Sequence, residues 1–204
     1  GDEKYMVIPG LRQQVQSWSE YMNVAKNYDP TRSLVTILIG ANDFVNYDIS
    51  ADKVLADVKD SIRILAEKRI KHIIILNLPD VTKAPVFHMG KDPAPVLERV
   101  TEYNRQLPII LDALRRDFPD LDIKMFDTKT ALDDALANPQ KYQLENTTDS
   151  CLEINEDSST NYITTHNPRE SCSDASKFIF WDTLHITTRT HQVLADEIRA
   201  FMSN

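Results

Sequence analysis

The sequence predicts an α/β fold in which helices flank a parallel sheet. Three short runs of mostly β-branched and other apolar residues lie at 33–39, 71–76 and 121–126. The segments between them carry apolar residues at helical spacing, and strands that alternate with helices form parallel sheets covered on both faces. The ligand site of such a sheet lies beyond the carboxyl ends of its strands, so the residues that follow each run are the candidates for function.

The first predicted elements are a helix and a strand. Apolar residues recur at three- and four-residue steps over 10–27, and a Tyr-Asp-Pro triplet ends that helix. The run at 33–39 is predicted to be a strand buried on both faces, because its apolar residues are nearly continuous. It ends at a Gly-Ala-Asn-Asp run, after which Ser50 or Asp52 is expected to cap a helix that extends to residue 69.

The middle of the chain repeats this alternation. The run at 71–76 is again predicted to be a fully buried strand, and it ends at an Asn-Leu-Pro-Asp sequence. Residues 93–118 have a mostly helical pattern, with Pro108 as the expected position of a kink. A strand over 121–126 and a short helix over 128–137 complete the predicted sheet and its cover.

Both cysteines, Cys151 and Cys172, lie in a polar segment over 139–176 that is predicted to be a long loop. Free thiols on an exposed segment are reactive, so we expect a disulfide that closes this loop rather than two inert buried thiols. A disulfide in turn implies an oxidising compartment.

The C-terminal part is predicted to contain a short extended run over 177–182 and a final helix that ends near residue 202. Thr187 or Thr188 is expected to cap this helix. Trp181 is expected to pack in the core, and the alternative is that it forms a wall of an acyl site.

Asp182 and His185 stand three residues apart between the extended run and the final helix. On a tight turn these side chains can be hydrogen-bonded directly, so that the carboxylate holds Nδ1–H and Nε2 can act as a general base. Taken alone, a D-x-x-H pair is also typical of an ordinary surface turn.

Gly40 and Asn42 follow the first predicted strand. Glycine at such a position permits a close approach of the backbone and an unusual φ. The side-chain N–H of an asparagine there can donate to a developing oxyanion. Taken alone, the same residue types are more typical of an ordinary turn.

The composition excludes several classes of function. The formal net charge is −8, from 23 Lys and Arg against 31 Asp and Glu, which argues against a nucleic-acid partner because phosphate contacts need clustered cations. The longest apolar runs have the length of strands, well short of the roughly 20 residues of a membrane span. The four glycines form neither G-x-G-x-x-G nor a Walker A motif, and the histidines form no metal-ligand pattern. The length of 204 residues fits a single domain over 1–204.

Four longer motifs occur in a fixed order along the chain. They are I-G-A-N-D-F-V-N-Y at 39–47, L-N-L-P-D-V-T-K-A-P at 76–85, C-L-E-I-N followed by S-S-x-x-Y-x-x-T-H and a second Cys over 151–172, and K-F-I-F-W-D-T-L-H-I-T-T-R-T-H at 177–191. Together they resemble the GDSL, or SGNH, hydrolases, in the branch of thermolabile hemolysins and lecithinases. The similarity extends from Ile8 to about Met202.

This resemblance implies an SGNH-like α/β/α sandwich and acyl-ester hydrolysis without a cofactor or a metal. By matching positions, Asn42 is the side-chain donor to the oxyanion and Gly40 shapes its loop, while His185 is the general base and Asp182 orients it. The branch includes secreted bacterial phospholipases A, lysophospholipases and glycerophospholipid:cholesterol acyltransferases. It therefore implies a secreted or periplasmic bacterial enzyme that meets a phospholipid or lysophospholipid transiently at a membrane surface.

The G-D-S block that carries the nucleophilic serine of this family is absent from the sequence. Gly1-Asp2-Glu3 does not match it, because no strand precedes it and Glu is not the required nucleophile. The other serines considered lie in predicted helices or at strand starts: Ser17, Ser19, Ser33 and Ser61. We therefore expect a C-terminal portion of a GDSL hydrolase domain, inactive by itself, whose N-terminal portion supplies the serine and a central strand.

Two other functions remain open at this point. One is a GDSL esterase that acts on short-chain or carbohydrate esters, which differs in the depth of its acyl pocket. The other is a non-catalytic binding module on a flavodoxin-like sheet, in which case the G-x-N-D and D-x-x-H sequences occur by coincidence. The cysteine loop ends just before Asp182, so it is either a lid over the site or a tethered surface loop.

Overall fold

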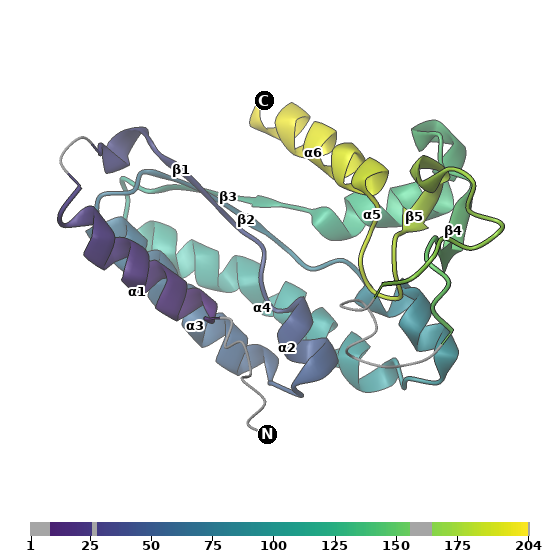
Figure 1. The fold of residues 1–204 in the computed structure, drawn as a ribbon. Helices are drawn as coiled ribbons and strands as arrows, with labels where there is room; N and C mark the ends of the chain where they lie inside the picture. Colours follow the sequence, from purple (N-terminus) through teal and green to yellow (C-terminus); the bar gives the residue numbers. More distant parts are fainter. Residues whose placement is uncertain (1–8, 26–27, 156–164, 204) are drawn as a thin grey trace, which may run out of the picture.

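A three-stranded parallel sheet forms the centre of the computed structural model, which describes residues 9–25, 28–155 and 165–203. Its strands are β1 (Leu34–Ile37), β2 (His72–Leu76) and β3 (Asp122–Phe126), and they lie in that order (Figure 1). The predicted α/β fold with a parallel sheet is thereby confirmed. Three features of the sequence fall outside the described residues: Gly1-Asp2-Glu3, the end of the first predicted helix at 26–27, and the serine- and tyrosine-containing part of the cysteine loop at 156–164.

Helices lie on both faces of this sheet. Helices α1 (Leu11–Met22), α3 (Ala51–Glu67) and α4 (Ala94–Asp117) cover one face, while α6 (Thr188–Met202) crosses the other beside α5 (Thr128–Ala137) (Figure 1). The short helix α2 (Ala41–Asn46) follows β1 directly. Of the predicted caps, Ser50 caps α3 and Thr187 caps α6. Ser50 Oγ accepts from the N–H of Lys53, and Thr187 Oγ1 accepts from the N–H of Thr190.

Strand β2 is buried on both faces, as its continuous apolar run predicts. Ile73 and Ile75 point into the main core with α3 and α4, whereas Ile74 and Leu76 belong to a second cluster that α6 covers with Ile198 and Phe201. The alternation follows from the two-residue period of a strand. Because all three strands are parallel, their carboxyl ends lie at one edge of the sheet.

The prediction that β1 is also buried on both faces is wrong. Val35 and Ile37 face the main core, but Leu34 is 44% exposed and Leu38, just beyond the strand, is 55% exposed. Strand β1 stands at an edge of the sheet, and within the described residues only β2 pairs with it. A continuous apolar run therefore predicts a strand, but it does not show whether other elements cover both faces of that strand.

The polar segment predicted as a loop over 139–176 contains a strand. Strand β4 (Asn146–Ser150) pairs in parallel with β5 (Phe178–Phe180) and forms a second, two-stranded sheet with an irregular register. A disulfide joins Cys151 and Cys172, whose Cα atoms are 5.3 Å apart, so the predicted pairing is confirmed. Such bonds are typical of proteins from oxidising compartments.

Within residues 9–25, 28–155 and 165–203, no helix combines the length and the apolar character that a membrane span requires. Likewise, no group of three or more His, Cys, Asp or Glu side chains in those ranges could hold a metal ion.

We predict that the disulfide contributes substantially to stability. Replacing both Cys151 and Cys172 by Ala should lower the free energy of unfolding by about 3 kcal/mol, because the bond restricts the unfolded chain. Urea titration without reductant measures this difference, and wild-type protein in reductant is the matched control. Two thiols that titrate in unreduced, unfolded protein would show that the bond is not formed.

Candidate active site

The turn between β5 and α6 brings Asp182 and His185 into direct contact. His185 Nδ1 lies 2.8 Å from Asp182 Oδ2, while Asp182 Oδ1 accepts from the backbone N–H groups of Leu184 at 2.8 Å and His185 at 2.7 Å. The side chain of Asp182 is only 6% exposed and that of His185 is 55% exposed. With Nδ1–H bound to the carboxylate, the neutral ring carries its basic lone pair on Nε2.

The same contacts alter the pKa of both groups. Burial acts to raise the pKa of the Asp182 carboxyl, but its hydrogen bonds from His185 and the backbone outweigh this effect and the net pKa is lowered. The hydrogen bond to Asp182 raises the pKa of His185 above its ordinary value, against a smaller opposing effect of burial. The carboxylate is therefore ionised at neutral pH and favours a proton on the ring.

Several backbone contacts hold this turn in place. The N–H of Trp181 donates to the carbonyl of His185 at 2.8 Å, which closes the turn on itself. The carbonyl of Thr183 accepts from Val86, in the 3₁₀ segment Pro85–Met89 that follows β2. On the other side, the N–H of Cys151 donates to the carbonyl of Phe180, so the disulfide-bonded residue is attached to the strand that leads into Asp182.

The loop after β1 has a backbone that only glycine adopts readily. Gly40 has φ +112°, and a Cβ atom there would lie 3.2 Å from Leu78 Cδ1 and 3.3 Å from Val54 Cγ1. Gly40 thus permits both the change of chain direction and the close packing at the end of β1. Asn42, in the first turn of α2, is exposed, and its Oδ1 accepts a 2.6 Å hydrogen bond from Asn46 Nδ2.

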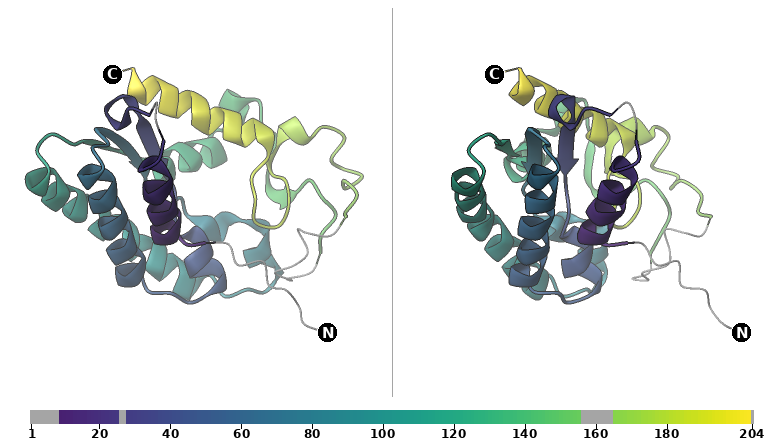
Figure 2. Two further views of the ribbon diagram at one scale, coloured as in Figure 1. Left: turned by 60° about the vertical axis from the view of Figure 1, so that its left-hand side comes forward. Right: turned by 90° about the vertical axis from the view of Figure 1, so that its left-hand side faces the viewer.

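The two halves of the candidate site lie at the same end of the molecule. Helix α2 and the segment between β5 and α6 are both found where the strands of the main sheet terminate (Figures 1 and 2). This end is the location predicted for a ligand site in a parallel α/β sheet.

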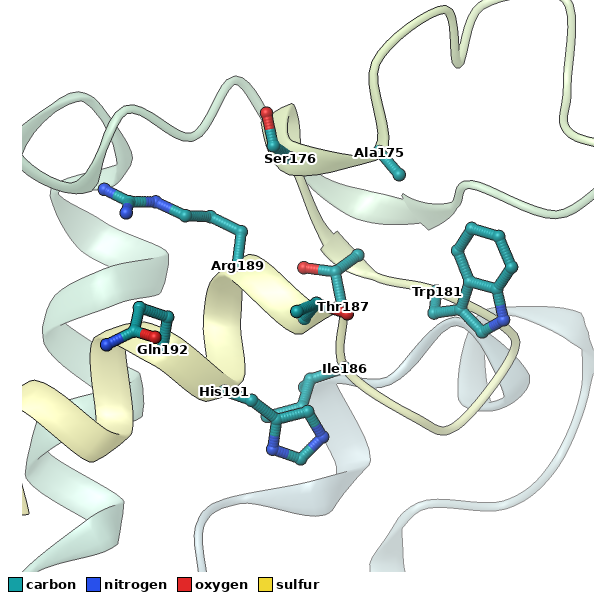
Figure 3. Close-up of a pocket in the computed structure, with 9 residues that line it drawn as sticks. Ala175, Ser176, Trp181, Ile186, Thr187, Arg189, His191 and Gln192 are labelled. Atoms are coloured by element: carbon teal, nitrogen blue, oxygen red, sulfur yellow. The ribbon is translucent and has the colours of Figure 1, made fainter.

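A cavity of about 520 Å³ adjoins the turn. Trp181 and Ile186, which flank the Asp182–His185 turn, line it together with His191 and Gln192 from the first turns of α6 (Figure 3). Trp181 is 39% exposed, so the expectation that it packs in the core is wrong. The structure instead places it on the wall of this cavity.

Sequence reasoning missed the residues that support the loops. Asn104, inside α4, clamps Leu78 by accepting from its N–H at 2.9 Å and donating to its carbonyl at 2.7 Å. Leu78 is the residue that packs against Gly40. No local pattern signals a long-range contact of this kind. Asn46, by contrast, follows Asn42 by four residues, and that spacing could have indicated a pair on one face of a helix.

A parallel α/β sheet with an Asp–His pair at the end where its strands terminate is an arrangement compatible with a hydrolase that uses histidine as its base. The chain belongs to the GDSL-like lipase/acylhydrolase family, whose family model matches residues 3–198. This match confirms the resemblance predicted from the four motifs.

Individual relatives support the same branch. The chain is 33% identical over 208 residues to the thermolabile hemolysin of Vibrio parahaemolyticus, covering 100% of this chain and 49% of the relative. It is 23% identical to the phosphatidylcholine-sterol acyltransferase of Aeromonas hydrophila, over 98% of this chain and 68% of the relative. A GDSL esterase/lipase of Arabidopsis thaliana is 27% identical, over 97% and 64%. The chain thus spans about half to two thirds of the length of these relatives.

We predict that Gly40→Ala destabilises the protein more than Gly90→Ala. Both glycines have a positive φ, +112° and +106°, but a Cβ atom at Gly90 meets no atom within 4 Å. The strained backbone should cost about 1–3 kcal/mol at either position, and crowding against Leu78 and Val54 should add to the loss at Gly40. Urea unfolding of both variants measures the difference, and equal losses would show that crowding plays no part.

We also predict that Asp182 raises the pKa of His185 in solution. Titration of the His185 ring protons by NMR should give a pKa above the ordinary 6.5, and Asp182→Asn should lower it because the ionic partner is lost. The contact of protonated His185 with Asp182 thus stabilises the folded state below about pH 6.5. This stabilisation is lost as the pH rises through the pKa that His185 has in the folded protein. Asp122→Asn, which removes the carboxylate 3.4 Å from His72 Nδ1, is the matched control and should leave His185 unchanged. A His185 pKa that does not fall in Asp182→Asn would contradict the assignment.

Proposed function

We propose that this protein is a secreted lipid acyl hydrolase that cleaves acyl esters of phospholipids or lysophospholipids by Ser–His–Asp catalysis. The observation that carries the proposal is the buried Asp182 carboxylate, 2.8 Å from His185 Nδ1. This contact fixes the tautomer and orientation that a general base needs. Membership of the GDSL-like lipase/acylhydrolase family supports the reaction class.

In the proposed mechanism His185 Nε2 removes the proton of a serine hydroxyl as its oxygen attacks the ester carbonyl. Asp182 stabilises the imidazolium that forms, and Asn42 Nδ2 donates a hydrogen bond to the oxyanion. The imidazolium then gives its proton to the departing alcohol, which leaves an acyl-serine. Water, activated by the same histidine, releases the fatty acid, and a second alcohol in place of water gives acyl transfer.

The nucleophilic serine is proposed to come from polypeptide that precedes this chain. Ser17 and Ser19 lie on α1, Ser61 lies on α3, and Ser33 precedes β1 at the amino end of the strand. None of these positions is at the carboxyl edge of the sheet, where Asp182 and His185 lie. We therefore propose, because the family's G-D-S block is also absent from the sequence, that the partner of this chain in catalysis is the N-terminal portion of the same protein.

Three observations support an amphiphilic substrate. The relatives include proteins named as a hemolysin and a phosphatidylcholine-sterol acyltransferase. The cavity beside Trp181 has a size typical of small-molecule sites, at about 520 Å³, and Trp181 and Tyr47 expose large apolar surfaces next to the two site segments. The disulfide fits an enzyme that is exported and meets lipid at a membrane surface.

The test compares this chain with the complete enzyme that contains the serine. The complete enzyme should release nitrophenol from nitrophenyl esters in a burst and should hydrolyse phosphatidylcholine or lysophosphatidylcholine in micelles, whereas this chain alone should do neither. His185→Ala in the complete enzyme should abolish nearly all turnover, because nothing else in the proposed site removes the serine proton. The matched control His72→Ala, on an exposed strand end, should retain activity.

Each outcome separates the possible functions. Hydrolysis of short-chain or carbohydrate esters without activity on lipids would indicate an esterase of the same family instead. Enzyme-like burst kinetics of this chain alone would place the nucleophile within it. Absence of any reaction of the complete enzyme with a fluorophosphonate probe would favour a non-catalytic binding module.

A further inference from the structure

We infer that Asn46 is a positioning residue that sets which end of the Asn42 side-chain amide faces the reacting ester, an inference that rests on the proposed function. The two residues lie one helical turn apart on α2 and are both exposed. Asn46 Nδ2 donates to Asn42 Oδ1 at 2.6 Å. The bond therefore occupies the oxygen of the Asn42 amide.

The orientation matters because the two ends of an amide have opposite roles. Nδ2 carries two donor hydrogens, whereas Oδ1 can only accept. An oxyanion is stabilised by the donor end and is repelled by the oxygen, so a rotation of the Asn42 amide by 180° would turn stabilisation into repulsion. Within the described ranges no hydrogen bond engages Asn42 Nδ2, so Asn46 holds the acceptor end and leaves the donor end for a ligand.

The backbone of α2, which carries both asparagines, is itself fixed by contacts with α4. Arg99, on α4, donates from Nη1 to the carbonyl of Phe44 at 3.2 Å, and its Nη2 lies 2.8 Å from Asp48 Oδ1, just after the helix. The Phe44 ring is fully buried and packs edge-on against Tyr103 of α4, with ring centroids 5.9 Å apart. Helix α2 has six residues and is too short to be stable alone. The packing of Phe44 in the core and the contacts of Arg99 near its C-terminal end thus stabilise it.

An ordinary structural role of the pair makes a different prediction. Side-chain pairs at this spacing stabilise helices only slightly, and an acceptor at position 46 could still pair with Asn42 by receiving a hydrogen bond from Nδ2. In Asn46→Asp, such a pair would keep the helix contact but turn the amide so that its oxygen faces the ester. The two roles are therefore separated by the direction of the hydrogen bond.

The experiment measures kcat and KM in the complete enzyme for a series at position 46. Asn46→Leu, similar in size but without hydrogen bonds, should lower kcat about 5-fold, the equivalent of one ordinary hydrogen bond. Asn46→Asp should lower kcat by more than this, and Asn46→Gln, which keeps a donor, should lower it least. KM should change little throughout, because the oxyanion forms only after the substrate has bound.

Two further variants complete the design. Asn138→Leu removes a hydrogen bond of the same length and spacing, from Asn138 Nδ2, just after α5, to Asp134 Oδ1 at 2.6 Å, and should leave kcat unchanged. Asn42→Ala should lower kcat about 10²–10³-fold, and adding Asn46→Leu to it should cause no further loss, because the two residues act as one unit.

The outcomes distinguish this inference from the proposed function. If Asn42→Ala lowers kcat but the Leu and Asp variants at position 46 do not, the role of Asn46 is overturned and that of Asn42 stands. If Asn42→Ala has no effect on kcat, the roles of both Asn42 and Asn46 are overturned. Equal losses in Asn46→Asp and Asn138→Leu, matched by equal losses of thermal stability, would also overturn the inference in favour of a purely structural contact.

Discussion

Strand β2 lies between β1 and β3 and buries side chains on both faces, and the positions of the other elements follow from that burial. Its isoleucines require apolar cover above and below the sheet, which α3 and α4 supply on one side and α6 on the other. Parallel pairing then directs the carboxyl end of each strand to one edge. The loop of Gly40 lies at this edge as a consequence. The packing of the sheet thus determines the position of the loop, independently of the oxyanion chemistry proposed for Asn42.

A second constraint is the burial of the Asp182 carboxylate. An ionised group removed from water is costly unless its lone pairs are satisfied. Among the described residues, each donor that reaches it comes from within three positions along the chain: the N–H of Leu184, the N–H of His185 and the His185 ring. The D-x-x-H spacing therefore has two effects in this tight turn. The backbone N–H groups of the turn satisfy the carboxylate, and the same backbone orients the imidazole toward it.

The two halves of the site are held by different means. The Asp182–His185 turn depends on contacts that are local in sequence, with support from β4 and from the segment after β2. Asn42 depends on long-range contacts, because Arg99 holds the end of its helix and Leu78 packs against the glycine before it. A substitution distant in sequence can therefore disturb the proposed oxyanion donor while leaving the proposed base intact.

The sequence by itself determined the alternation of strands and helices, the family motifs and the spacing of Asp182 and His185, because periodicity and short spacings are local properties. Only the tertiary structure decided that the polar run Asn146–Ser150 is a strand, since its pairing with β5 overrides its low strand propensity. The sequence likewise did not predict the exposed outer face of β1 or the hydrogen bonds between Asn104 and Leu78. Each depends on which distant segments meet, and no local pattern records that information.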